Sequence, residues 1–100
     1  MKVSFRQSGG FAPIFVGASF DTEANPGPEA TELEALIKNS GILTLSNAKV
    51  KGARDVYFYT FDIDTGNQKH EVTLDQLSVP PAVQPLIDFV KARSRNMLPD

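Results

Sequence analysis

The stretch Ser8-Gly9-Gly10-Phe11-Ala12-Pro13 joins two segments in which apolar residues alternate with other residues. These segments, residues 2–7 and 14–20, are predicted β-strands because the alternation has a period of two. A Gly-Gly pair between two such strands predicts a tight hairpin, whose turn needs positive φ angles. The large aromatic Phe11 follows the glycines directly, where a turn favours a small or polar residue. Phe11 therefore either folds back onto the sheet or is displayed to a partner.

The composition of the chain indicates one globular domain. It has 100 residues, of which 41% are hydrophobic and 22% are charged, and these values are ordinary for a single folded unit. We expect residues 1–95 to form this domain and residues 96–100 to form a frayed tail. The absence of cysteine in the sequence excludes disulfides and thiolate chemistry.

Charge and hydropathy restrict the partners and the compartment. Ten basic and 12 acidic residues give a formal net charge of −2, and neither sign forms a long run. We therefore expect no nucleic-acid or membrane partner, since both require a basic patch. No apolar run approaches the ~20 residues of a membrane span, and the first residues lack the apolar core of a signal peptide. The default expectation is a cytoplasmic protein, with non-classical export left open, and a monomer when free.

The remaining elements complete an α+β pattern. Pro28 and Gly41 delimit a predicted helix over residues 28–40, and residues 82–94 are predicted to form a second helix. Between the helices, strands at 55–63 and 68–74 flank a second turn, Asp64-Thr65-Gly66-Asn67.

This ββαββα order predicts a four-stranded antiparallel sheet with both helices on one face. If the second and third strands pair, the Gly9-Gly10 tip and the Gly66 tip lie at one end of the sheet and form a two-loop surface.

No catalytic or metal-binding constellation stands out in the sequence. The single histidine, His70, has no partner at a metal-ligand spacing, so a structural or surface role is favoured. Asp62, Asp64, Asn67 and Glu71 superficially suggest a calcium loop, but the EF-hand register fails and turn residues are the simpler interpretation. We expect no cofactor, no metal site and no enzymatic activity.

Aromatic residues alternate along the third predicted strand. Tyr57, Tyr59 and Phe61 share one face, as do the stacking residues of sheet-type RNA binders. Because no Lys or Arg is interleaved with them, packing on that face is the favoured interpretation.

Residues 3–12, Val3-Ser4-Phe5-Arg6-Gln7-Ser8-Gly9-Gly10-Phe11-Ala12, resemble the RSGGFAG-type start of the emfourin family. The likeness covers roughly residues 2–92 and is carried further by Asp21-Thr22, Leu33-Glu34-Ala35-Leu36-Ile37, Phe58-Tyr59 and Pro81-Ala82-Val83-Gln84-Pro85-Leu86-Ile87-Asp88-Phe89. Two positions differ from the family pattern: Pro13 stands where a Gly is common, and Asp64-Thr65-Gly66 replaces Glu-Asp-Gly-Gly.

Emfourins are small protein inhibitors of thermolysin-like zinc metalloproteases of the protealysin subgroup, which are often encoded beside them. The resemblance implies a protease-binding site at Ser8, Gly9, Gly10, Phe11 and Ala12, with Phe11 in the pocket that takes a large apolar residue just after the scissile bond. The turn Asp64, Thr65, Gly66 and Asn67 is a secondary contact in this interpretation. The zinc would belong to the enzyme.

A second class of function stays open from the sequence. The same scaffold suits a non-inhibitory interaction or accessory domain that docks by its sheet edge or its hairpin loops. Titration of a thermolysin-like protease with the purified protein distinguishes the two classes.

Overall fold

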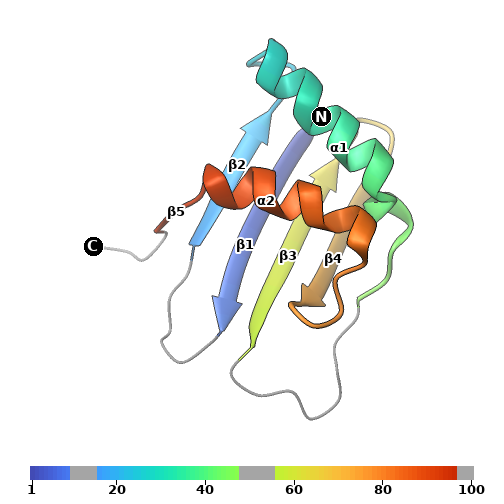
Figure 1. Cartoon of the computed structure of the whole chain (residues 1–100). Helices are drawn as coiled ribbons and strands as arrows, with labels where there is room; N and C mark the ends of the chain where they lie inside the picture. Colours follow the sequence, from blue (N-terminus) through green and yellow to red (C-terminus); the bar gives the residue numbers. More distant parts are fainter. Residues whose placement is uncertain (10–15, 48–55, 97–100) are drawn as a thin grey trace.

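A computed structural model describes residues 1–9, 16–47 and 56–96, without the side chains of residues 95 and 96. Along the chain the elements alternate between pairs of strands and single helices (Figure 1). The order is β1 (Lys2–Gly9), β2 (Val16–Asp21), α1 (Pro28–Ser40), η1 (Ile42–Thr44), β3 (Tyr57–Asp64), β4 (Lys69–Asp75), η2 (Pro81–Val83), α2 (Gln84–Ala92) and β5 (Arg95–Asn96).

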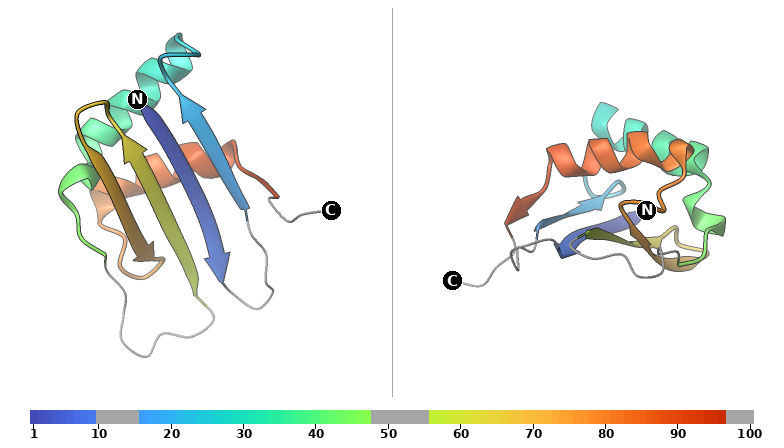
Figure 2. Two further views of the ribbon diagram at one scale, coloured as in Figure 1. Left: turned by 180° about the vertical axis from the view of Figure 1, so that it is seen from behind. Right: turned by 60° about the horizontal axis from the view of Figure 1, so that its bottom comes forward.

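The molecule has two layers, a sheet and a pair of helices on one of its faces (Figure 2). The strand order in the sheet is β4-β3-β1-β2-β5, and every neighbouring pair is antiparallel. The predicted α+β class, the ββαββα order and the two helices on one face are confirmed. The two-residue strand β5 is an addition to the four predicted strands.

The core lies between the sheet and the two helices, and the alternation of β1 supplies its centre. Val3 and Phe5 are buried, while Lys2, Ser4 and Arg6 are exposed on the opposite face. The Phe5 ring lies 5.0 Å from the Phe61 ring, centroid to centroid, and packs against β3. The other buried apolar residues are Leu33, Ile37, Ile42, Tyr59, Ile63, Val72, Leu74, Val83, Leu86, Ile87, Phe89 and Val90.

The boundaries of α1 follow the predicted signals. Pro28 occupies the first turn, where its missing N–H is not needed. Gly41 ends the helix in the left-handed conformation, with φ of 73°. Ser40 Oγ donates to the Ile37 carbonyl at 2.8 Å and accepts from the Ile42 N–H at 3.1 Å, which turns the chain into the core.

The second helix is shorter than predicted. Residues 81–83 form the turn η2, Pro85 lies in the first turn of α2, and α2 ends at Ala92 rather than at residue 94. The chain then leaves the helix layer and pairs with the edge of β2, with Asn96 opposite Val16 and Arg95 opposite Gly17. Phe89 of α2 is buried in the core.

The condition for a two-loop surface is not met, because β3 pairs with β1 and not with β2. Lys2 lies opposite Asp64, and Gly9 lies opposite Tyr57. The Gly66 turn and the end of β1 are therefore at opposite ends of the sheet, roughly 25 Å apart along the strand. The aromatic residues of β3 explain this choice, since they pack on Phe5, whereas β2 carries small residues at positions 17–19.

Candidate functional site

The structure describes two of the five predicted tip residues, Ser8 and Gly9. They end β1, with Ser8 opposite Phe58 and Gly9 opposite Tyr57. Gly10, Phe11 and Ala12 lie outside the described residues, and so does the choice between a displayed and a packed Phe11. The structure describes the end of β1 and the start of β2, residues 7–9 and 16–17, which we call the stem.

Gly9 is required by the contact between β1 and β3. Its φ is 96°, a left-handed value that side-chain-bearing residues rarely adopt. A Cβ at this position would lie 2.6 Å from the carbonyl oxygen of Val56 and 3.3 Å from Cδ2 of Phe58. Real Cβ atoms do not approach a backbone oxygen so closely, so only glycine lets the end of β1 meet β3 here.

Both strands of the stem have a second neighbour at this end of the sheet. β1 is bonded to β3 as far as Gly9, while Val16 and Gly17 at the start of β2 are bonded to β5. Hydrogen bonds also link the start of β3 to the residue that follows β4. Tyr57 N–H donates to Gln76 Oε1 at 2.7 Å, and Gln76 N–H donates to the Tyr57 carbonyl at 2.9 Å. The stem is therefore held from both sides.

Two large apolar residues are exposed in the described part of the chain, Tyr57 and Leu77. Tyr57 begins β3 beside Gly9, and Leu77 follows Gln76 directly. Sequence reasoning assigned Tyr57 to packing and did not select Leu77 as a site residue. The signal available was a leucine inside a polar turn, which is too common on protein surfaces to be specific.

The secondary site residues form a compact turn at the other end. The Asp64 carboxylate accepts from the Gly66 N–H at 2.9 Å, and Thr65 N–H donates to the Gln68 carbonyl at 2.9 Å. Gly66 has φ of 98°, with open space where a Cβ would stand. The structure does not bring Asp64, Thr65, Gly66 and Asn67 together with Ser8 and Gly9.

His70 has a structural contact. Its Nε2 lies 2.7 Å from the Leu45 carbonyl oxygen and links β4 to the segment that follows η1. Within residues 1–9, 16–47 and 56–96, no three His, Asp or Glu side chains gather closely enough to hold a metal ion. The acidic residues of the Gly66 hairpin serve as turn and surface groups in this part of the chain.

Three alternate aromatic residues of β3, Tyr57, Tyr59 and Phe61, lie on the face of the sheet that the helices cover. Tyr59 and Phe61 are buried there, and Tyr57 continues their row to the end of the sheet. Lys91 of α2 places its Nζ 5.7 Å from the centre of the Tyr59 ring. The packing interpretation is confirmed for Tyr59 and Phe61, which are unavailable as a stacking platform.

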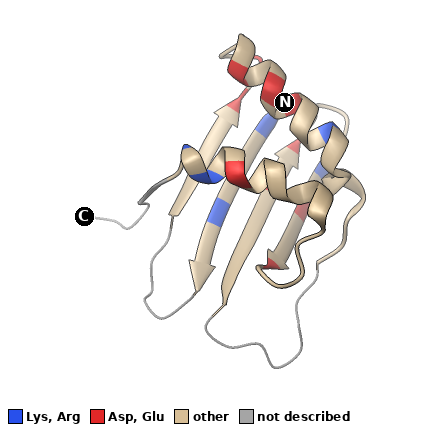
Figure 3. Cartoon of the chain, in the orientation of Figure 1, with Lys and Arg blue, Asp and Glu red and all other residues tan. Residues whose placement is uncertain are grey.

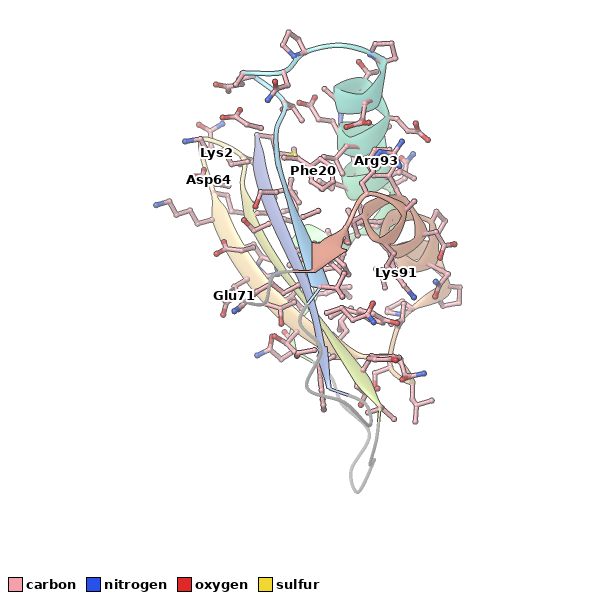
Figure 4. All side chains as sticks on the ribbon, turned by 90° about the vertical axis from the view of Figure 1, so that its left-hand side faces the viewer. Lys2, Phe20, Asp64, Glu71, Lys91 and Arg93 are labelled. Carbon is pink, nitrogen blue, oxygen red and sulfur yellow. The ribbon has the colours of Figure 1, made fainter. Side chains whose placement is uncertain are left out.

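A groove of about 580 Å³ separates β2 from α1. Phe20 points from the sheet toward the helices beside Arg93, whereas Lys2, Asp64 and Glu71 lie on the uncovered face (Figure 4). Arg93 Nε pairs with Glu29 Oε2 at 2.9 Å, and the guanidinium lies 3.8 Å from the Phe89 ring centre. Among the described strands, β2 beyond Gly17 has β1 as its single neighbour, so this groove borders an open sheet edge.

Charges of both signs are interspersed over the described elements (Figure 3). The environment of Asp21 shifts its pKa downward. The pKa of its carboxyl is lowered chiefly by the N–H of Ala24, which donates to it at 3.1 Å, with help from the N–H of Glu23 and the nearby charge of Lys2. This carboxylate closes the turn after β2, at the end of the sheet opposite Gly9.

Neither described helix combines the length and the apolar character that crossing a lipid bilayer requires.

A family model described as Emfourin matches residues 5–91 of the chain. The match begins in β1 and ends in α2, so it includes the candidate stem, both hairpins and α1. No curated protein and no solved structure matched the sequence. A match over most of the chain shows that this protein belongs to the Emfourin family, a family of protease inhibitors.

Proposed function

We propose that this protein inhibits a thermolysin-like zinc metalloprotease of the protealysin subgroup, encoded near its own gene. The observation that carries the proposal is the Emfourin match over residues 5–91, which includes the segment Ser8–Ala12. This segment enters the active-site cleft and competes with substrate without forming a covalent bond. The catalytic zinc belongs to the protease.

The tip acts as a substrate-like plug. Phe11 fills the pocket that receives the large apolar residue just after the scissile bond, and Gly10 lets the backbone come close to the zinc. The stem supports this role because its strands are bonded on both sides, to β3 and to β5. A stem that is held before docking does not have to be ordered when the inhibitor binds, so that part of the entropy cost is avoided.

The contact centres on the end of the sheet where β1 ends and β2 begins. The turn of residues 64–67 lies at the opposite end, and the N–H groups of Thr65 and Gly66 are already bonded within the turn. We therefore do not include this turn in the proposed contact.

The first test is the substitution Phe11→Ala. Loss of a buried aromatic anchor weakens an interface by about 2–4 kcal/mol, so the inhibition constant toward a thermolysin-like protease rises by ~30-fold to 1,000-fold. The melting temperature stays close to that of the wild type if Phe11 serves the partner. Equal losses of stability and of inhibition would instead show that Phe11 packs on its own sheet.

Phe20→Ala is the matched control, because it removes the same side chain far from the tip. Phe20 lies opposite Val3 and packs on the core, so its loss lowers the melting temperature but leaves the inhibition by the folded protein unchanged. If the protein is instead an accessory domain that docks by the open edge of β2, Phe20→Ala should weaken binding to its partner and Phe11→Ala should not. This alternative also predicts that the wild-type protein leaves the hydrolysis of a fluorogenic peptide unaffected at stoichiometric ratio.

A further inference from the structure

The described residues expose apolar surface at one end of the sheet. Leu77 is 61% exposed and Tyr57 is 37% exposed, and these are the two large hydrophobic residues exposed in that part of the chain. Both lie at the end where β1 finishes, since Gly9 pairs with Tyr57 and Tyr57 is hydrogen-bonded to Gln76. Two exposed apolar residues thus lie at the end of the sheet where β1 ends, at Gly9.

The turn that carries Leu77 is fixed by hydrogen bonds. Leu77 N–H donates to the Asp75 carboxylate at 2.8 Å, and Ser78 N–H donates to the Asp75 carbonyl at 3.0 Å. Asp75 itself is fully buried. The side chain of Leu77 does not belong to the core cluster, although its backbone is firmly held. The turn therefore presents a leucine to solvent in a defined position.

A single exposed leucine is common on protein surfaces and carries no argument alone. The argument here is that Leu77 and Tyr57 lie at the same end of the sheet as the end of β1. A stable protein–protein interface uses about 20–30 residues on each side, so a five-residue tip needs neighbouring surface. The row Gly9–Tyr57–Gln76 leads from the tip to Leu77 without a charged residue.

We propose that Leu77, together with Tyr57, is a second contact with the same protease and packs on an apolar part of the rim of its cleft. This inference rests on the proposed inhibitory function. In this proposal the turn that carries Leu77, rather than the Gly66 turn, makes the second contact with the protease. The partner's matching surface is uncharged and apolar, since a charged rim would lose water on contact without gaining a partner.

The test compares Leu77→Asp with Asn39→Asp. Both substitutions add one negative charge at an exposed position, but Asn39 lies on α1 in the helix layer. We expect Leu77→Asp to raise the inhibition constant by about tenfold or more and Asn39→Asp to change it by less than about twofold. Both variants keep the wild-type melting temperature within a few degrees, because both side chains are exposed.

Leu77→Ala provides a second variant that introduces no charge, and it should weaken inhibition by roughly fivefold. If the Leu77 variants inhibit as well as Asn39→Asp while Phe11→Ala is weak, the second contact is wrong and the proposed function stands. If the two aspartate variants lose inhibition equally, the effect is one of net charge and the contact is again wrong. A wild-type protein that does not inhibit overturns both proposals.

Discussion

The two ends of the sheet are built in opposite ways. The charged residues Lys2, Asp21 and Asp64 lie at the Gly66 end, where the carboxylates of Asp21 and Asp64 accept N–H groups of the adjacent turns. At the Gly9 end, the exposed residues include Tyr57 and Leu77, and they are apolar. The first arrangement is explained by solubility and turn formation. The exposed apolar residues of the second are the basis for the proposal that this end meets the protease.

The glycines of the two ends sharpen the contrast. Gly9 and Gly66 have nearly the same φ angle, 96° and 98°. Gly66 has open space around it, whereas Gly9 is pressed against the carbonyl of Val56. Gly66 is needed for the conformation of its turn, whereas Gly9 is needed for the close contact between β1 and β3.

The largest expected effect comes from the core that both ends share. Phe61 is fully buried midway along β3 and packs on Phe5. Phe61→Ala should lower the free energy of unfolding by about 3–5 kcal/mol. Urea unfolding followed by circular dichroism measures this loss of free energy. Amide exchange during the same unfolding reports on each end of the sheet separately. A transition at one end that precedes the other would show that the two ends do not share one cooperative core.

The paired substitutions Gly9→Ala and Gly66→Ala come next. Alanine in a left-handed conformation costs about 1–2 kcal/mol, and this is the loss expected at Gly66. At Gly9 the steric conflict with Val56 adds a further ~1–3 kcal/mol. The two melting temperatures measure the difference directly. Equal losses would contradict the close approach of β1 to β3.

The smallest effect concerns the charged end and depends on pH. The pKa of Asp21 is lowered from 3.8 in the folded protein, so its ionised form stabilises the fold above the pKa of the unfolded chain. This stabilisation is lost as the pH falls through the folded pKa. In Asp21→Asn the free energy of unfolding should therefore differ from that of the wild type by a constant amount near neutral pH, and the difference should shrink below about pH 4. Denaturation at a series of pH values tests this, and a difference that persists at low pH would point to a cause other than ionisation.

Local features of the fold were predictable from the sequence. Pro28 and Gly41 mark α1 through backbone rules that act within a few residues. The alternation around Val3 and Phe5 correctly indicates which face of β1 is buried. Such patterns depend on the period of the element and need no knowledge of the rest of the chain.

The neighbours of each strand were not predictable in the same way. A period of two indicates which face of a strand is buried but not which strand lies beside it, and the pairing of β1 with β3 depends on contacts such as Phe5 with Phe61. The strand β5 has two polar residues and no strand signal. It forms where α2 ends close to the edge of β2.

The hairpin that carries the candidate site was predictable only in part. The Gly-Gly pair correctly indicated that β1 and β2 form a hairpin, but the predicted tight turn at these residues is wrong, because Gly9 belongs to β1 and Gln7 lies opposite Val16, with residues 8–15 between them. The position of Leu77 beside the stem follows from the pairing of β3 with both β1 and β4, which is a property of the whole sheet. An exposed leucine cannot be distinguished from a buried one by its neighbours in sequence.

The pairing of β1 with β3 also has a consequence for the rate of folding. Gly9 reaches its place beside Tyr57 only after the chain has closed a long loop that contains β2 and α1. Loops of this kind slow folding, because their entropy is lost before the contact that compensates for it forms. The base of the tip is therefore assembled late, after the local hairpin of β3 and β4. Because such a late contact contributes little to the folding barrier, substitutions that weaken the joint between Gly9 and β3 should leave the folding rate nearly unchanged and should instead speed unfolding.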